Sequence, residues 1–172
     1  LPVPLIVAEP VRVKLTARIS ELSDPGQALH GRLVLGQRVT GVYVYNTNTP
    51  NQSPFPGTGQ YLPFAGEARV RFVTGSLVFE SAQPTQGILI GVFPQSPQSD
   101  GQFFVDSSDN KPLADGTIVT DIHVNFRGTG NLTQSEALPA VAPEPASYFT
   151  RDVMLSGFGA GNSFFVRAQI ER

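Results

Sequence analysis

Apolar and polar residues alternate with a period of two along much of the chain, which predicts β-strands with one buried and one solvated face. In residues 11–20 the apolar set is Val11, Val13, Leu15, Ala17 and Ile19, with polar or charged residues between them. Residues 68–74 repeat the pattern, and Gly75-Ser76 leads into a further apolar run at 77–81. We therefore expect a β-hairpin at that point.

The same pattern predicts strands at residues 38–46, 87–93, 101–106, 117–127, 151–157 and 163–171. In 117–127 the expected shared face is Ile118, Thr120, Ile122, Val124 and Phe126. About nine strands separated by turns predict an all-β fold, a two-sheet antiparallel β-sandwich or jelly roll, with a closed barrel as the alternative. We expect one such domain over residues 1–172.

Helix is expected at one place only. Thr133 and Glu136 have the spacing of a capping box, and Pro139 follows. The prediction is a short helix or a 3₁₀ turn that ends before this proline.

Composition supports an all-β domain and excludes several classes of function. The 17 Gly and 15 Pro interrupt any long helix. The net charge is −2 with no block of basic residues, which argues against nucleic-acid binding. No apolar run approaches the ~20 residues of a membrane-spanning helix. The absence of cysteine excludes disulfides and thiolate metal sites.

Tyrosines are the first candidate ligand-binding residues. Tyr43 and Tyr45 share one face of a predicted strand, and Tyr61 follows the next long loop. Aromatic rings on a surface can stack on sugar rings, so these three are a candidate sugar platform. The alternative is that they form a core face.

Aspartates between residues 100 and 115 are the candidate metal ligands. Asp100, Asp106, Asp109 and Asp115 lie close together in the sequence, and Ca²⁺ binds to crowded loop oxygens. The spacing lacks the bidentate Glu of an EF-hand, and Asp also stabilises turns locally. We expect no obligatory cofactor, with Ca²⁺ as the only candidate.

Histidines offer the one candidate for acid–base chemistry. His123 lies two residues from Asp121 on the same predicted face, and His30 is the only other histidine. No Gly-x-Ser-x-Gly motif accompanies them, and the acidic residues form no evident pair for glycoside hydrolysis. We interpret His123 and Asp121 as a surface pair and assign no catalytic residue.

The N-terminal residues 1–10 are a candidate extended arm. They lack an initiator Met and the basic flank of a signal peptide, as a mature or trimmed terminus does. Such an arm could complete the sheet of a neighbouring molecule, or it could pack on its own domain. Pro2, Pro4 and Pro10 restrict strand pairing where they occur.

Several segments in the same order resemble exported bacterial proteins of uncharacterised function, which often carry a PEP-CTERM sorting tail. They are residues 39–50 (VTGVYVYNTNTP), 54–61 (PFPGTGQY), 113–119 (LADGTIV), 137–139 (ALP) and 162–168 (NSFFVRA). The resemblance implies export and an all-β domain at the cell surface or in the extracellular matrix. It implies no activity. Residues 1–172 include no sorting tail, and we interpret the Pro-Glu-Pro within residues 142–147 as coincidental.

These observations favour a non-enzymatic extracellular structural or adhesion module of the cell surface, a biofilm matrix or a filament. The expected partners are further copies of the chain or an extracellular polysaccharide, and neither nucleic acid nor a membrane span is expected. The alternative is a carbohydrate-binding module, assisted by calcium. A hydrolase with its site spread over several strands is the third hypothesis.

Overall fold

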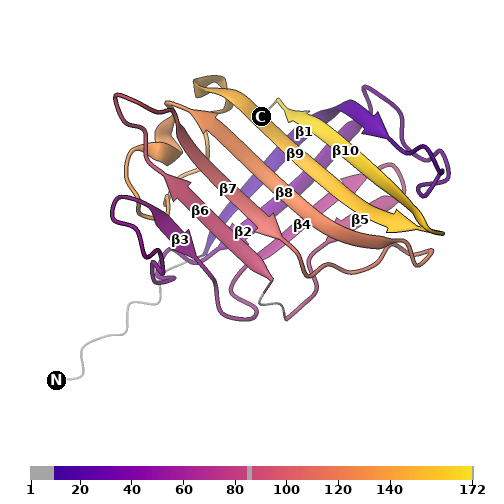
Figure 1. Cartoon of the computed structure of the whole chain (residues 1–172), viewed down its shortest axis with the longest axis horizontal. Coiled ribbons are helices and arrows are strands. Elements are labelled where there is room, and N and C mark those ends of the chain that lie inside the picture. Colours follow the sequence, from indigo (N-terminus) through magenta and orange to yellow (C-terminus); the bar gives the residue numbers. More distant parts are fainter. Residues whose placement is uncertain (1–9, 85–86, 172) are drawn as a thin grey trace.

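The protein is one ten-stranded antiparallel sheet, as its computed structural model shows for residues 10–84 and 87–171 (Figure 1). The strands are β1 (Val11–Ser23), β2 (Arg38–Tyr45), β3 (Gly59–Tyr61), β4 (Arg69–Thr74), β5 (Leu77–Glu80), β6 (Ile88–Phe93), β7 (Gly101–Ser107), β8 (Ile118–Gly128), β9 (Tyr148–Gly159) and β10 (Asn162–Ile170). Nine of the ten strands lie where the alternation predicts them. The exception is β3, whose three residues are too few to show a period.

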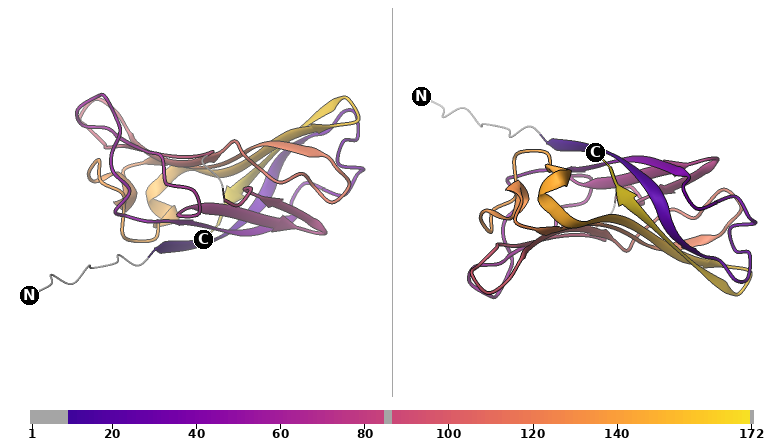
Figure 2. Two further views of the ribbon diagram at one scale, coloured as in Figure 1. Left: turned by 90° about the horizontal axis from the view of Figure 1, so that it is seen from below. Right: turned by 90° about the horizontal axis from the view of Figure 1, so that it is seen from above.

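The strand order is β3-β6-β7-β8-β9-β10-β1-β2-β4-β5. Backbone pairing is unbroken because β1 bonds to β10 on one side and to β2 on the other. The sheet curls strongly into a half-barrel, so that β6 to β10 face β1, β2, β4 and β5 across the interior (Figures 1 and 2). The predicted two-sheet sandwich is therefore wrong. Alternation shows which residues face inward, but it carries no information on which strands pair.

Both edges of the sheet are short and partly covered. At one edge, the end of β5 meets the residues that follow β7 through an isolated bridge between Ser81 and Asn110. The N–H of Lys111 donates to the carbonyl of Glu80 at 2.9 Å. At the other edge, β3 forms a bridge from Tyr61 to Asn51. These contacts pair part of each edge within the chain, which is one way in which β-proteins limit pairing with other chains.

Side chains from the inner face form one hydrophobic core. Rings from the two facing halves meet there, since Tyr43 of β2 lies 6.2 Å from Phe103 of β7. Phe79 of β5 lies 6.2 Å from Phe164 of β10. The predicted inward set of β1 is confirmed: Val13, Leu15, Ala17 and Ile19 are buried, and Val11 packs against the core. Aromatic contacts of this kind hold the two halves of the curled sheet together.

A β-bulge in β8 changes the predicted face of that strand. The pairing with β9 shifts between Val119 and Asp121, so an extra residue is inserted there. Ile122, Val124 and Phe126 are buried as expected, but Ile118 is 45% exposed and Val119 faces the core at 2%. The prediction for Ile118 and Thr120 is therefore wrong, because the bulge shifts the alternation by one residue.

The described part of the chain contains two 3₁₀ turns, η1 (Asn131–Thr133) and η2 (Pro145–Ser147). The expected 3₁₀ turn is thus present, but the capping box is wrong because η1 ends at Thr133. The Thr133 hydroxyl donates to the carbonyl groups of Gly128 and Gly130, at 3.3 and 3.1 Å. Of the predicted N-terminal arm, residues 1–9 lie outside the described residues.

Candidate functional site

The three candidate tyrosines lie in the core. Tyr43 and Tyr45 are fully buried, and Tyr61 is 4% exposed. The Tyr45 hydroxyl donates to the carbonyl of Pro139 and the Tyr61 hydroxyl to that of Glu136, each at 2.6 Å. Sugar stacking requires exposed rings, so these residues present no platform. The alternative of a core face is what the structure shows.

The four candidate metal ligands are separated by the fold. Asp106 on β7 bonds to His123, whereas Asp100 precedes β7 and Asp109 follows it. Asp115 accepts hydrogen bonds from Thr117 and Arg32, which lower its pKa to about 2. Within residues 10–84 and 87–171, no three His, Asp or Glu side chains are placed to hold a metal ion. The crowding of these aspartates in sequence is therefore not reproduced in space.

Asp106, Asp121 and His123 form a small cluster on the outer face of β7 and β8. Nδ1 of His123 lies 3.2 Å from Oδ1 of Asp106. This hydrogen bond lowers the pKa of Asp106, whereas burial and the neighbouring Asp106 raise the pKa of Asp121 to about 7. The cluster therefore holds one ionised carboxylate and one that gains or loses its proton near neutral pH. The sequence pattern pairs His123 with Asp121 and offers Asp106 only as a candidate metal ligand, whereas in the structure Asp106 of the adjacent strand is the residue that bonds to His123.

Aromatic rings extend from this cluster onto β6. The ring of Phe104 is nearly parallel to His123 at 5.5 Å and to Phe93 at 6.1 Å. A side chain at Gly91 would place its Cβ 2.2 Å from the Phe104 ring, so the glycine gives the ring room to lie over β6. Phe93 is 43% exposed. The outer face of β6 and β7 thus presents the exposed aromatic surface that the tyrosines do not.

A second polar group lies beside the cluster, on β8 to β10. Arg167 approaches Asp152 at 3.5 Å and donates to Glu21 at 2.8 Å. Asn125 accepts a hydrogen bond from Gln102 at 2.9 Å. Burial raises the pKa of Asp152, and the charge of Arg167 opposes this. Among the described residues, Oδ1 of Asp152 and Nε of Arg167 have no hydrogen-bond partner, so this polar group is only partly satisfied.

The opposite half of the outer face is basic. Six exposed cations lie on β1, β2 and β4: Arg12, Lys14, Arg18, Arg38, Arg69 and Arg71. Each is followed in sequence by an inward apolar residue, so no block of charge is visible in the chain. The absence of a basic block in the sequence therefore does not mean the absence of a basic face in the fold.

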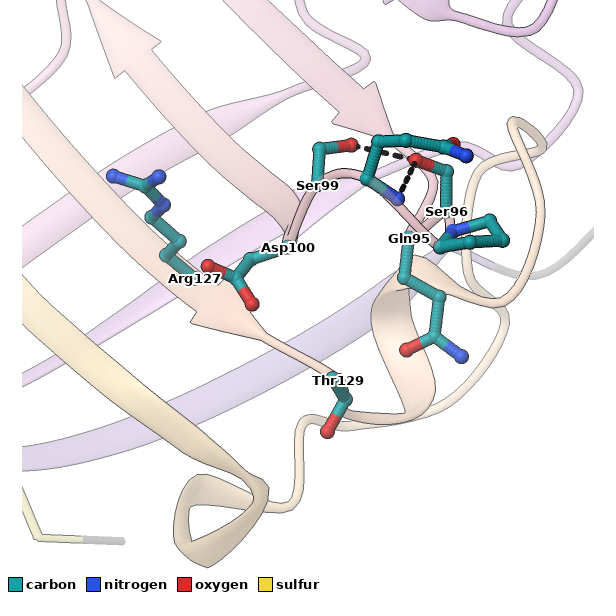
Figure 3. A pocket seen from close by; sticks show the side chains of 8 residues that line it. Gln95, Ser96, Ser99, Asp100, Arg127 and Thr129 are labelled. Atoms are coloured by element: carbon teal, nitrogen blue, oxygen red, sulfur yellow. Dashed lines mark hydrogen bonds between the residues drawn. The ribbon is translucent and has the colours of Figure 1, made fainter.

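A recess of about 750 Å³ lies at the loop between β6 and β7, and is lined by Gln95, Ser96, Pro97, Gln98, Ser99, Asp100, Arg127 and Thr129. Its hydroxyl groups bond each other, with Ser96 Oγ 2.9 Å from Ser99 Oγ (Figure 3). The guanidinium group of Arg127 points away from these serines and lies 5.8 Å from the Phe149 ring. The recess offers polar atoms but no histidine.

The described residues contain no helix long and apolar enough to cross a membrane. No family model, no curated protein and no solved structure matches the chain.

Proposed function

We propose that the protein is a non-enzymatic structural or adhesion module of an extracellular surface, which contacts its partners through the outer face of its sheet. One observation carries this proposal. The inner face is used by the core, while the outer face displays a basic half and a polar half with exposed rings. Binding chemistry on a broad, open surface suits attachment. The resemblance to exported proteins supports the extracellular location.

The geometry around His123 favours binding over catalysis. A triad needs a hydroxyl or thiol within hydrogen-bond reach of the imidazole. Among the described residues, His123 bonds to Asp106, whereas the hydroxyl groups of Thr120 and Ser156 lie 3.2 Å from each other. The cluster also lies half-buried on the open outer face of the sheet, with 19% of the His123 side chain and 33% of the Asp106 side chain exposed. It is therefore suited to contact a partner and poorly suited to activate a nucleophile.

Adhesion is tested with the full chain on insoluble extracellular material. The protein is mixed with bacterial cell-wall sacculi or with purified insoluble exopolymer, and the bound fraction is measured after sedimentation. Size-exclusion chromatography and electron microscopy of the same sample test self-assembly. Saturable binding to a surface, or ordered assembly, is expected. A strictly monomeric protein that binds none of these materials would contradict the proposal.

A carbohydrate-binding module is the second candidate, favoured by the row formed by Phe93, Phe104 and His123. Nearly parallel rings beside the carboxylate of Asp106 offer a stacking surface and a hydrogen-bond acceptor. A glycan array with the wild-type protein is expected to show a ligand that Phe93→Ala loses. Phe158→Ala, a similarly exposed ring on β9, is the control. If the protein bound no glycan on the array, either with or without a chelator, this candidate would be excluded.

A further inference from the structure

We propose that the outer face of β1, β2 and β4 binds an anionic polysaccharide chain, one that carries carboxylate or sulfate groups. We call this surface the basic face, and it consists of Arg12, Lys14, Arg18, Arg38, Arg69 and Arg71. The inference rests on the proposed adhesion function and names the class of its partner.

Strand register arranges the cations of the basic face in rows. In the first row, Arg12 and Arg69 flank Val44 of β2. In the next row, Lys14 and Arg71 flank Val42. Neighbouring strands lie about 4.8 Å apart and alternate residues rise about 7 Å, so the two cations of a row have backbones about 10 Å apart and successive rows about 7 Å apart. This is a regular array of positive charge on the scale of a sugar repeat.

Few anions neutralise this array. Arg18 pairs with Glu171 at 2.7 Å, and Arg71 approaches Glu80 at 3.9 Å. Among the described residues, Arg12, Lys14, Arg38 and Arg69 form no ion pair. Arg18 and Arg38 are also direct cross-strand partners, and like charges opposite each other destabilise a sheet. An anionic ligand would relieve this repulsion, so charge complementarity points to a polyanion.

The shape and lining of the basic face favour one class of polyanion. The residues between the cations are aliphatic or hydroxyl-bearing: Thr16, Thr40, Val42, Val44 and Val73. Proteins that hold single-stranded nucleic acid stack its bases on aromatic rings, and the outer face of β1, β2 and β4 carries none. The face is the convex side of a curled sheet (Figure 2), which an extended flexible chain can follow and a flat membrane cannot.

A second copy of the chain fits less well. On the opposite half, Asp106 and Asp152 already bond to or pair with His123 and Arg167, and burial and the neighbouring Asp106 raise the pKa of Asp121 to about 7. Contact between two convex faces also buries little surface, and stable interfaces need about 1,200 Å² or more. The polysaccharide is therefore the occupant that charge and shape favour together.

The test uses polygalacturonate as the anionic probe and dextran as its neutral counterpart. Binding of the full chain is measured by biolayer interferometry at several salt concentrations. Wild-type protein is expected to bind polygalacturonate, with affinity falling steeply as salt rises, and to ignore dextran. The double variant Arg12→Gln/Arg69→Gln is expected to bind about tenfold more weakly and with a shallower salt dependence, because fewer counterions are released.

The matched control is Gln60→Glu/Gln98→Glu, which lowers the net charge by the same two units at exposed positions outside the basic face. It is expected to retain most of the wild-type affinity. Equal weakening in both double variants would overturn the inference, since net charge alone would then explain binding. Tighter binding to oligo-dT or to phosphatidylserine vesicles than to polygalacturonate would overturn it as well, in favour of that other polyanion.

The outcomes separate this inference from the proposed function. Absence of polygalacturonate binding, together with retained sedimentation on cell-wall material, would refute the basic face and leave the adhesion function standing. If the wild-type protein bound no surface in any assay, both the inference and the proposed adhesion function would be refuted. Thermal unfolding of each variant confirms that the fold is intact.

Discussion

At the scale of single residues, two stacked tyrosines in the core differ in one hydrogen bond. The rings of Tyr43 and Tyr45 are 6.0 Å apart, and only the Tyr45 hydroxyl has a partner among the described residues. We expect Tyr45→Phe to lower the free energy of unfolding by about 1 kcal/mol and Tyr43→Phe to leave it unchanged or raise it slightly. Urea unfolding of both variants at pH 7 is the measurement. If both variants lost the same free energy of unfolding, the finding that the Tyr43 hydroxyl has no hydrogen-bond partner would be contradicted.

Asp121 makes stability depend on pH. Its carboxyl group ionises near 3.8 in the unfolded chain but holds its proton to about 7 in the folded protein. The unfolded state therefore loses its proton first, and this residue destabilises the fold progressively from about pH 4 to pH 7. We expect Asp121→Asn to be more stable than wild type by about 1–2 kcal/mol at pH 8, with partial solvent screening included, and equal to it at pH 3.5.

Asp115 provides a control of opposite sign. Hydrogen bonds from Thr117 and Arg32 lower its pKa to about 2, so its contribution is present above the unfolded pKa and is lost as the pH falls towards 2. Asp115→Asn is thus expected to destabilise the protein at pH 7. Thermal unfolding from pH 3 to pH 8 records both variants. If Asp121→Asn destabilised the protein at pH 7 as Asp115→Asn is expected to, the raised pKa of Asp121 would be contradicted.

At the scale of elements, the bulge in β8 decides which residue enters the core. Val119 is buried and Ile118 is exposed, although alternation from Ile122 backward predicts the reverse. We expect Val119→Ser to cost about 2–3 kcal/mol of unfolding free energy, because it removes buried methyl groups and adds a buried hydroxyl. Ile118→Ser should cost less than about 1 kcal/mol. A larger loss at Ile118 than at Val119, measured by urea unfolding, would contradict the bulge.

The strands themselves follow from local sequence, whereas their arrangement does not. Alternation in β1 is regular enough to place Val13, Leu15 and Ala17 in the core without any structure. The curl depends on β1 pairing with β10, more than 140 positions away, as between Ile19 and Ala168. No local pattern encodes that pairing, so the number of strands alone predicts a sandwich as readily as a single curled sheet. The bulge at Thr120 is equally hidden, because it depends on the partner strand β9.

Prediction of the candidate site from sequence is limited in the same way. The proximity of His123 and Asp121 follows from their spacing in the sequence, but Asp106 joins them only because β7 pairs with β8 in the observed register. Likewise, Arg12 and Arg69 lie on different strands and become neighbours across Val44. The prediction of a tyrosine platform is wrong for a different reason: residues 42–45 are all apolar, so their pattern leaves open which face of β2 is buried. Surface chemistry of a sheet is thus set by register, which the sequence alone does not reveal.

At the scale of the whole molecule, the pairing of β10 with β1 joins strands from the two ends of the chain. On one side of this junction lie β3 and β6 to β9, and on the other lie β2, β4 and β5. Each half buries its inner face against the other, as the contact between Tyr43 and Phe103 shows. Neither half therefore retains a closed core alone, and we expect them to unfold together.

This cooperativity is tested with a substitution at the junction. Val166 on β10 is fully buried and pairs with Leu22 of β1 and Leu155 of β9. Val166→Ala is expected to lower the free energy of unfolding by about 2 kcal/mol. Far-UV circular dichroism follows the whole sheet, and fluorescence follows the four tyrosines, which lie on β2, β3 and β9. Both signals should shift together, because loss of packing at the junction weakens both halves. Because both signals report on both halves, an unfolding curve with two steps in either signal would mean that the halves fold independently.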